Sequence, residues 1–286
     1  MNPLIDLPYL SIYILIFHGS SDGRSRTASE ALTNRFRDRV AYRQQSPWVT
    51  DKPAVSVGGS LPLLEGSIVS NLQAVEMCDR DQPFVYAAYL ECHSLPLHQQ
   101  IEQIAQQVQA ENPLKKISLR LLPVFLLPGV HLLEDIPAEI AQAQQLLGDQ
   151  IMLEVTAHLG SHLGLRGLLS ERMLSLPREA WILLAHGSRR LNANQPIAAL
   201  ADDVGATIAY WSTSPNLESR LQDCLSSGCK TIGVLPYFLF PGGMTDAIAH
   251  SITQFDQSHP ALKVTLTEPL NASAGLVDLL VDLAGE

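Results

Sequence analysis

Three residues in the first half of the chain, His18, Glu91 and His131, each follow an apolar segment of the kind that forms a buried strand. Imidazole suits divalent iron and cobalt, and a carboxylate can hold a metal ion or accept a proton. Each residue alone also has a structural explanation, because a single histidine after a strand more often makes hydrogen bonds and Glu91 could simply end a strand. Their occurrence after three successive strands makes them the candidate site.

Two phrases of the chain occur twice. Residues 16–20 (IFHGS) resemble 184–188 (LAHGS), and residues 122–131 (LPVFLLPGVH) resemble 235–244 (LPYFLFPGGM). The first half therefore has a histidine in both phrases, whereas the second half keeps only His186. We interpret the chain as an internal duplication whose first copy has kept the chemistry.

Strand-like and helix-like segments alternate along the chain. We expect strands over 12–17, 84–90, 117–126, 151–156, 181–185, 207–211, 231–240 and 263–267, with helices between them that include 97–109 and 136–147. This order predicts an α/β protein of two similar lobes, each a parallel sheet flanked by helices. Such sheets bind ligands at the carboxyl ends of their strands, where the three candidate residues lie.

Length and composition agree with two lobes. The chain has 286 residues, 46% of them hydrophobic, which is enough for two cores. We expect an N-terminal lobe over 1–165 that carries the site and a C-terminal lobe over 166–286. The repeats are spaced more widely in the first half, which predicts an insertion over about 43–82 that is rich in proline and glycine and forms a loop.

No segment has the composition of a membrane span. The apolar run 10–17 has eight residues and no basic flank, so it is typical of a strand and not of a secretion signal. Cys78, Cys92, Cys224 and Cys229 show no Cys-x-x-Cys spacing, so we expect neither a disulfide framework nor a structural zinc site. We expect a cytoplasmic protein that does not bind membranes.

The net charge of −10 disfavours nucleic acid as a partner, because phosphate contacts need clustered basic residues. An anionic ligand would need a local basic patch. Arg24 and Arg26 form one after the first His-Gly-Ser turn, and Arg189 and Arg190 form one after the second. The alternative is that these four arginines are solvated charges near helix starts.

Three phrases resemble the sirohydrochlorin chelatases of the CbiX and SirB type: 18–20 (HGS), 87–91 (AAYLE) and 122–137 (LPVFLLPGVHLLEDIP). The resemblance covers nearly the whole chain outside the insertion. It implies a class II chelatase fold, in which two similar lobes face each other across a cleft and a divalent metal is inserted into a tetrapyrrole without ATP. It also implies that His18, Glu91 and His131 handle the metal, while the division of ligand and base roles among them stays open.

The same resemblance suggests contacts for the substrate, since sirohydrochlorin carries many carboxylates. Arginines bind carboxylates well, and the predicted substrate contacts are Ser20, Arg24, Arg26, Gly129, Arg189, Arg190 and Met244. The second half has Trp211 or Ser212 in place of Glu91, and Gly243 or Met244 in place of His131. We expect the second lobe to close over the macrocycle, with Tyr237 either against the ring or in the core.

Several other side chains have two interpretations. Asp135 or Glu134 either orients His131 or caps the next helix, and we favour the cap. His98 is expected to face solvent. His158 and His162 have a spacing that can bind metal on a helix, but glycines at 160 and 164 favour a loop that lines the cleft.

We therefore predict a lyase that inserts Co²⁺ or Fe²⁺ into sirohydrochlorin for cobalamin or siroheme synthesis. No cofactor is expected beyond the metal substrate, and a monomer is the simplest state. The alternative is a non-catalytic carrier of tetrapyrrole or metal that uses the same cleft. A hydrolase with Ser20 or Ser188 as nucleophile is disfavoured, because the chain has no Gly-x-Ser-x-Gly turn. The choice of metal and of pathway stays open.

Overall fold

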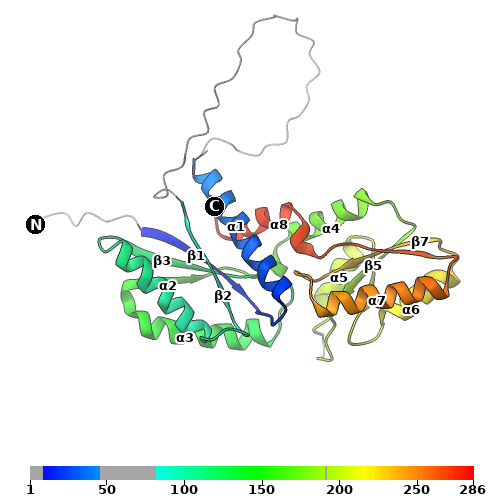
Figure 1. The fold of residues 1–286 in the computed structure, drawn as a ribbon, viewed down its shortest axis with the longest axis horizontal. Coiled ribbons are helices and arrows are strands. Elements are labelled where there is room, and N and C mark those ends of the chain that lie inside the picture. Colours follow the sequence, from blue (N-terminus) through cyan, green and yellow to red (C-terminus); the bar gives the residue numbers. More distant parts are fainter. Residues whose placement is uncertain (1–8, 46–81, 191) are drawn as a thin grey trace, which may run out of the picture.

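Two four-stranded parallel sheets form the framework of the protein (Figure 1). The computed structural model describes residues 9–45, 82–190 and 192–286. The first sheet has the order β2-β1-β3-β4 and consists of β1 (Tyr9–Phe17), β2 (Phe84–Tyr89), β3 (Lys116–Pro123) and β4 (Ile151–Val155). The second has the order β6-β5-β7-β8 and consists of β5 (Ala180–Ala185), β6 (Thr207–Tyr210), β7 (Thr231–Pro236) and β8 (Lys263–Leu266). The duplicated α/β architecture expected from the sequence is confirmed.

Helices cover both faces of each sheet. They are α1 (Gly23–Gln45), α2 (Leu97–Glu111), α3 (Ile136–Leu147), α4 (Gly164–Ser175), α5 (Gln195–Asp203), α6 (Leu217–Ser226), α7 (Gly243–Ser258) and α8 (Gly275–Leu283). Helices α2 and α3 pack on the outer face of the first sheet, and α6 and α7 on the outer face of the second. One continuous buried cluster joins the inner faces of both sheets with α1, α4, α5 and α8. The lobes therefore share a core.

The central strand β1 has an unbroken apolar and buried run over residues 12–17. Tyr13, Leu15 and Phe17 point into the shared core, whereas the residues between them face α2 and α3. A parallel strand that is covered on both faces needs apolar side chains in both alternating sets. This continuous burial fixes the direction in which β1 delivers His18 at its carboxyl end.

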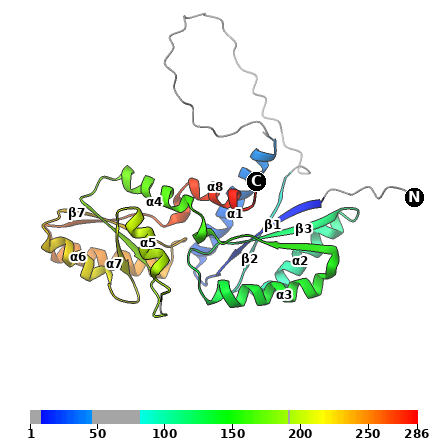
Figure 2. The ribbon, with the colours of Figure 1, turned by 180° about the vertical axis from the view of Figure 1, so that it is seen from behind.

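Each half of the chain places its last helix against the other lobe. Helix α8 lies beside α1 (Figures 1 and 2), and Arg39 of α1 bonds to Asp278 of α8 at 2.7 Å. Helix α4 is joined to the second lobe by an ion pair between its Arg166 and Asp203 of α5. Helices α4 and α8 are thus exchanged between the lobes. The exchange joins the lobes along the side that carries α1, α4 and α8.

The strand boundaries differ from the sequence prediction mainly at two places. Strands β3 and β7 end at Pro123 and Pro236, whereas the apolar runs continue to 126 and 240. Proline has no N–H to donate to the sheet, and the chain leaves the sheet shortly after it. Residues 43–45 belong to α1 and residue 82 lies before β2, while the rest of the expected insertion, 46–81, lies outside the described residues. The division into lobes at 165/166 stays a prediction.

Within the described ranges, no helix combines the length and the apolar composition that crossing a membrane requires.

Candidate metal site at the edge of the cleft

The loops after β1 and β2 are held together beyond the ends of the strands. The backbone N–H of Leu90 donates to the carbonyl of Phe17 at 2.9 Å, and the N–H of Glu91 donates to the carbonyl of His18 at 2.8 Å. The parallel hydrogen-bonding pattern thus continues for two residues beyond the ends of β1 and β2. As a result, His18 and Glu91 leave the first sheet next to each other.

Gly19 permits this close approach. Its φ is +94°, and a Cβ built at this position would lie 1.9 Å from the carbonyl oxygen of Glu91. A side chain would therefore be strained by the backbone conformation and would also collide with the neighbouring loop. The glycine of the His-Gly-Ser turn is needed to bring the carboxylate to the imidazole.

His131 comes from the third loop and begins a short π-helical turn, His131–Asp135, that leads into α3. In this turn His131 Nδ1 lies 2.7 Å from Asp135 Oδ2. A carboxylate only accepts hydrogen bonds, so Nδ1 carries the proton and Nε2 keeps its lone pair free for a metal. Asp135 makes no capping hydrogen bond to α3. The favoured cap interpretation was therefore wrong, and the orienting role is the one that the structure shows.

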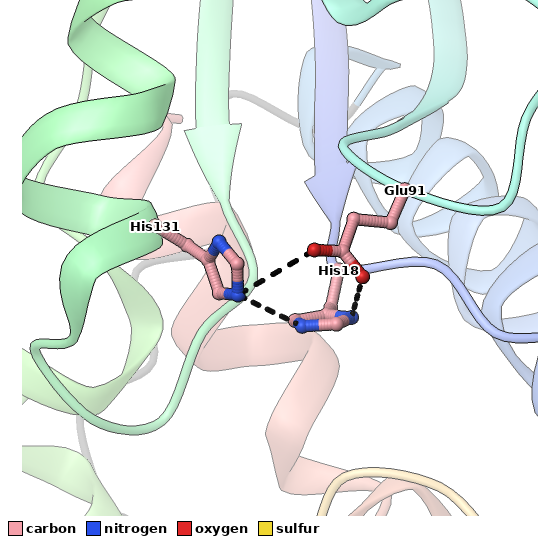
Figure 3. Close-up of side chains that lie close together, drawn as sticks. All are labelled: His18, Glu91 and His131. Carbon is pink, nitrogen blue, oxygen red and sulfur yellow. Dashed lines mark hydrogen bonds and ion pairs between the residues drawn. The ribbon is translucent and has the colours of Figure 1, made fainter.

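The three side chains meet at one point (Figure 3). His18 Nε2 lies 3.1 Å from His131 Nε2, while the Glu91 carboxylate lies 3.8 Å from His131 Nε2 and 3.9 Å from His18 Nδ1. Two nitrogens that bind a metal at right angles, each about 2.1 Å from it, are about 3 Å apart. Among the residues that the structure describes, these three form the one group of at least three His, Cys, Asp or Glu side chains close enough to share an ion.

The site is open to ligands. Side chains of His18 and Glu91 are 51% and 49% exposed. A cavity of about 440 Å³ opens beside His18 and is lined from both lobes. Its apolar wall includes Phe17, Phe125, Leu127, Tyr237 and Phe240, and its polar wall includes Ser20, Ser25, Arg26, Glu30, His93 and His186. A flat apolar ring with polar substituents matches the chemistry of these two walls.

The predicted substrate contacts fall into two groups. Ser20 and Arg26 line the cavity. Gly129, Arg189, Arg190 and Met244 are exposed but do not line it. Arg24 is held by Asp22 and Asp246, so its guanidinium already has carboxylate partners. The roles of all these residues in binding stay predictions, with Ser20 and Arg26 the best positioned of them.

The second lobe repeats the backbone of the site with other side chains. Ser212 N–H donates to the carbonyl of His186 at 2.9 Å, as Glu91 does to His18, so Ser212 and not Trp211 takes the place of Glu91. By the repeat of the proline phrase, Met244 stands in the place of His131. The residue four positions further on is Ile248, which is fully buried. His186 therefore lines the cavity with Ser212 and Met244 at the positions that correspond to Glu91 and His131.

Three predictions about individual side chains can be compared with the structure. His98 does not face solvent, because its Nδ1 lies 2.8 Å from Glu139 and its side chain is 16% exposed. His158 and His162 flank a 3₁₀ turn, as the glycines indicated, and they line a second cavity between the lobes and not the one beside His18. Tyr237 is buried and forms part of the cavity wall, and burial raises its pKa above the ordinary value.

Helix α1 contributes more to the cavity than the predicted Arg26. Ser25, Ser29 and Glu30 also line the cavity, and none of them was predicted. The first turns of α1 carry few apolar residues, so the face that meets the cavity has no hydrophobic pattern to mark it. The one feature of the sequence that could have indicated these cavity residues is that they form a polar stretch shortly after a His-Gly-Ser turn.

Comparison with known proteins agrees with the duplication. The CbiX family model matches residues 69–176 and again 180–286, so one family unit corresponds to each half. The chain belongs to the CbiX family. Glu91 and His131 lie inside the first matched segment, whereas His18 precedes it and is brought to the site by β1. In the second matched segment the equivalent histidine, His186, is included.

Individual proteins are similar to this chain over different lengths. A sirohydrochlorin cobaltochelatase from Priestia megaterium is 24% identical over 181 residues, which are 58% of this chain and 59% of that protein. The match thus spans little more than half of the relative. SirB from Bacillus subtilis with Fe³⁺ has a TM-score of 0.66 at 14% identity, over 96% of this chain and 94% of that one. Sirohydrochlorin chelatase SirB from Bacillus subtilis subspecies spizizenii in complex with cobalt has a TM-score of 0.62 at 15% identity, with the same coverage. These likenesses show a common fold.

Proposed function

We propose that this protein is a chelatase that inserts a divalent metal ion, Co²⁺ or Fe²⁺, into sirohydrochlorin. The observation that carries the proposal is the convergence of His18, Glu91 and His131 at the edge of a cavity between the lobes. Membership of the CbiX family supports the choice of substrate, as do the named activities of the sirohydrochlorin chelatases to which the chain is similar.

In the proposed reaction the metal is first held by the two imidazoles. The hydrogen bond to Asp135 leaves Nε2 of His131 free to bind, and Nε2 of His18 is its neighbour at 3.1 Å. Three protein ligands at most leave the remaining coordination positions to water. These waters can be replaced one at a time by nitrogens of the macrocycle, so that the ion does not lose all of its water ligands in one step.

The macrocycle is proposed to lie in the cavity between the lobes. Phe17, Phe125 and Phe240 offer an apolar surface to the ring, while Arg26 offers a charge-assisted contact to a carboxylate at its rim. Side chains from both lobes contribute to this wall. The second lobe would then help to bind the ring without binding the metal.

Metal insertion also requires the loss of protons. Two pyrrole N–H bonds break as the metal forms bonds to the ring nitrogens, so two protons must leave. Glu91 is the proposed acceptor, because its carboxylate lies within 4 Å of a nitrogen of each histidine and half of its surface is in contact with solvent. Each accepted proton can then pass to water, and the carboxylate is ready again.

The test is turnover under anaerobic conditions. Purified protein is mixed with an excess of sirohydrochlorin and of Co²⁺ or Fe²⁺, and the absorbance change of the metallated ring is followed. A chelatase forms many equivalents of product per chain at a rate well above that without protein. A carrier of tetrapyrrole or metal stops at one equivalent, and this outcome would contradict the proposal.

A further inference from the structure

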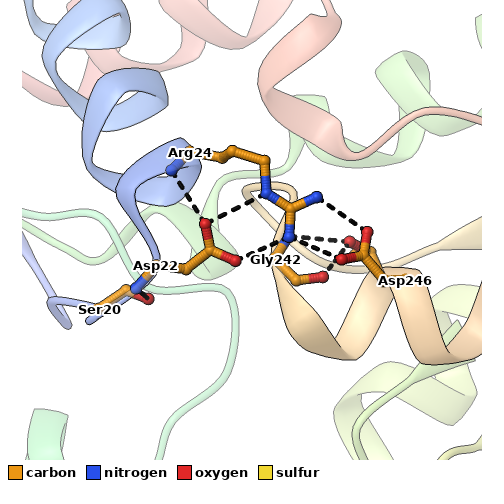
Figure 4. A network of polar contacts seen from close by, with 6 residues as sticks. Ser20, Asp22, Arg24, Gly242 and Asp246 are labelled. Carbon is orange, nitrogen blue, oxygen red and sulfur yellow. Dashed lines mark hydrogen bonds and ion pairs between the residues drawn. The ribbon is translucent and has the colours of Figure 1, made fainter.

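An arginine joins the two lobes at the cleft (Figure 4). Arg24, in the first turn of α1, donates to both carboxylate oxygens of Asp246 in the first turn of α7, at 3.0 and 2.7 Å. The same guanidinium donates to both oxygens of Asp22, at 3.2 and 2.7 Å. One cation of the first lobe thus lies between two carboxylates that belong to different lobes.

Asp22 reinforces this connection. Its Oδ1 accepts the backbone N–H of Arg24 at 2.9 Å, which caps the start of α1. Asp22 also lies beside the start of α7, because a Cβ built on Gly242, the residue before α7, would be 3.6 Å from Asp22 Oδ2. Arg24 lowers the pKa of Asp22 most, and the backbone of Gly243 lowers it further. Asp22 therefore lies at the starts of two helices, one from each lobe.

The position of these residues links them to the cavity. Asp22 and Arg24 stand between Ser20 and Ser25, which line the cavity on the side of the first lobe. Asp246 follows the segment 237–240, which forms the opposite wall. Two other ion pairs between the lobes, Arg39 with Asp278 and Arg43 with Asp282, join the later part of α1 to α8.

We propose that Asp22, Arg24 and Asp246 form a clasp that fixes the width of the cavity and holds the wall of the second lobe at the distance required by the tetrapyrrole. The inference rests on the proposed function for the identity of that ligand. The three are positioning residues, because they act through the wall and not on the metal. Two carboxylates around one guanidinium also leave a net negative charge, so the group is poorly suited to bind a polycarboxylate directly.

The substitution Asp246→Asn distinguishes the clasp from the alternative, in which Arg24 binds the substrate directly. Loss of the ion pair loosens the wall, and we expect the dissociation constant of metal-free sirohydrochlorin, measured by quenching of tryptophan fluorescence, to rise by up to about fivefold. If Arg24 instead binds a substrate carboxylate, the same substitution frees it and binding is unchanged or tighter. Unchanged or tighter binding overturns the clasp.

A charge exchange gives a second test. Arg24→Asp places three carboxylates together, and we expect binding to weaken by more than about tenfold because like charges repel. The double substitution Arg24→Asp with Asp246→Arg again puts one guanidinium between two carboxylates, and should restore affinity to within about threefold of the wild type. Failure of the double variant to recover, when circular dichroism shows that it is folded, contradicts the proposal.

Two further measurements keep the clasp distinct from the proposed function. Hydrogen exchange of peptides covering 20–26 and 242–248 should become faster in Asp246→Asn without any ligand, and unchanged exchange overturns the clasp. Asp282→Asn removes another Arg–Asp pair between the lobes, away from the cavity, and should leave tetrapyrrole affinity unchanged. If the wild type binds no sirohydrochlorin, the proposed function fails while the exchange experiment still tests the clasp.

Discussion

The two lobes have the same backbone at corresponding places but different side chains. The loop contact that brings Glu91 to His18 recurs between Ser212 and His186, with nearly the same hydrogen-bond length. Gly19 and Gly187 both have a positive φ, at +94° and +82°. The second lobe therefore has the loop geometry of the candidate site but only one of its three side chains, His186. Backbone geometry alone does not make the site.

The lobes differ most in the segment that carries His131 in the first lobe and Met244 in the second. His131 begins a π-helical turn that brings it to Asp135, whereas α7 starts as an ordinary α-helix at the equivalent place. The residue four positions after Met244 is Ile248, which packs in the core of the second lobe and offers no carboxylate. An extra residue in a helical turn re-aims side chains, and such turns are frequent at functional sites. The first lobe uses this device and the second does not.

The largest difference between the lobes is expected when each loses its histidine. His131→Ala removes a ligand and should lower the insertion rate by more than about 10²-fold, since metal sites depend on each of their few ligands. His186→Ala should leave most of the rate, because among the described residues His186 belongs to no group of three side chains that could share an ion. Initial rates at saturating metal and tetrapyrrole test both. Similar losses in the two variants would contradict the assignment of the active lobe.

Asp135→Asn should have the next largest effect. The amide can still accept from Nδ1 of His131 but carries no charge, so the imidazole becomes a weaker ligand and is less firmly oriented. We expect the affinity for Co²⁺ to fall by about 10- to 100-fold. Titration of Co²⁺ into the protein, followed by isothermal calorimetry, measures this directly. Glu139→Gln is a useful control, since Glu139 also contacts a histidine, His98, but away from the site.

A third experiment builds the missing ligands into the second lobe. Ser212→Glu together with Met244→His should create a second site around His186, because the backbone positions correspond. We expect two Co²⁺ ions per chain, with the new site about tenfold or more weaker, since Ile248 cannot orient the new histidine. Equilibrium dialysis counts the ions, and adding His186→Ala should return the number to one. A single ion in the double variant would show that the backbones differ more than their hydrogen bonds suggest.

The local pattern of the sequence was sufficient to predict most of the fold. Strand β1 is apolar in both of its alternating sets, and the repeated phrases placed β3 and β7 in equivalent positions. The exchange of α4 and α8 was not predictable in this way. The placement of these helices depends on the lobe against which each one packs. The apolar face of α8 has a pattern that could pack against either sheet. The packing of α8 is decided by contacts between residues more than 200 positions apart, as between Arg39 and Asp278.

The site was predictable in its residues and less so in its supports. His18, Glu91 and His131 follow strands, and parallel strands deliver their ends to one edge of a sheet. The contact of Asp135 with His131 depends on the π-turn, for which the sequence shows no distinct pattern. The contact of Arg24 with Asp246 crosses the lobes, and a charged residue near a helix start does not reveal its partner.

The smallest expected difference between the lobes is in the dependence of stability on pH. His158 precedes a short 3₁₀ turn, and Pro269 takes the same position before the equivalent turn of the second lobe. Burial lowers the pKa of His158 below its ordinary value of 6.5. As pH falls below that value, the unfolded chain takes up a proton that the folded chain resists, so the free energy of unfolding decreases until the lower pKa of the folded state is passed.

His158→Gln removes this titration and keeps a polar side chain of similar size. We expect the free energy of unfolding of the variant, from urea denaturation, to depend less on pH than that of the wild type below pH 6.5, and the two dependences to run parallel above it. The effect should be small, because the side chain is only partly buried. Equal slopes in the acid range would mean that His158 is protonated as easily in the folded protein as in the unfolded chain.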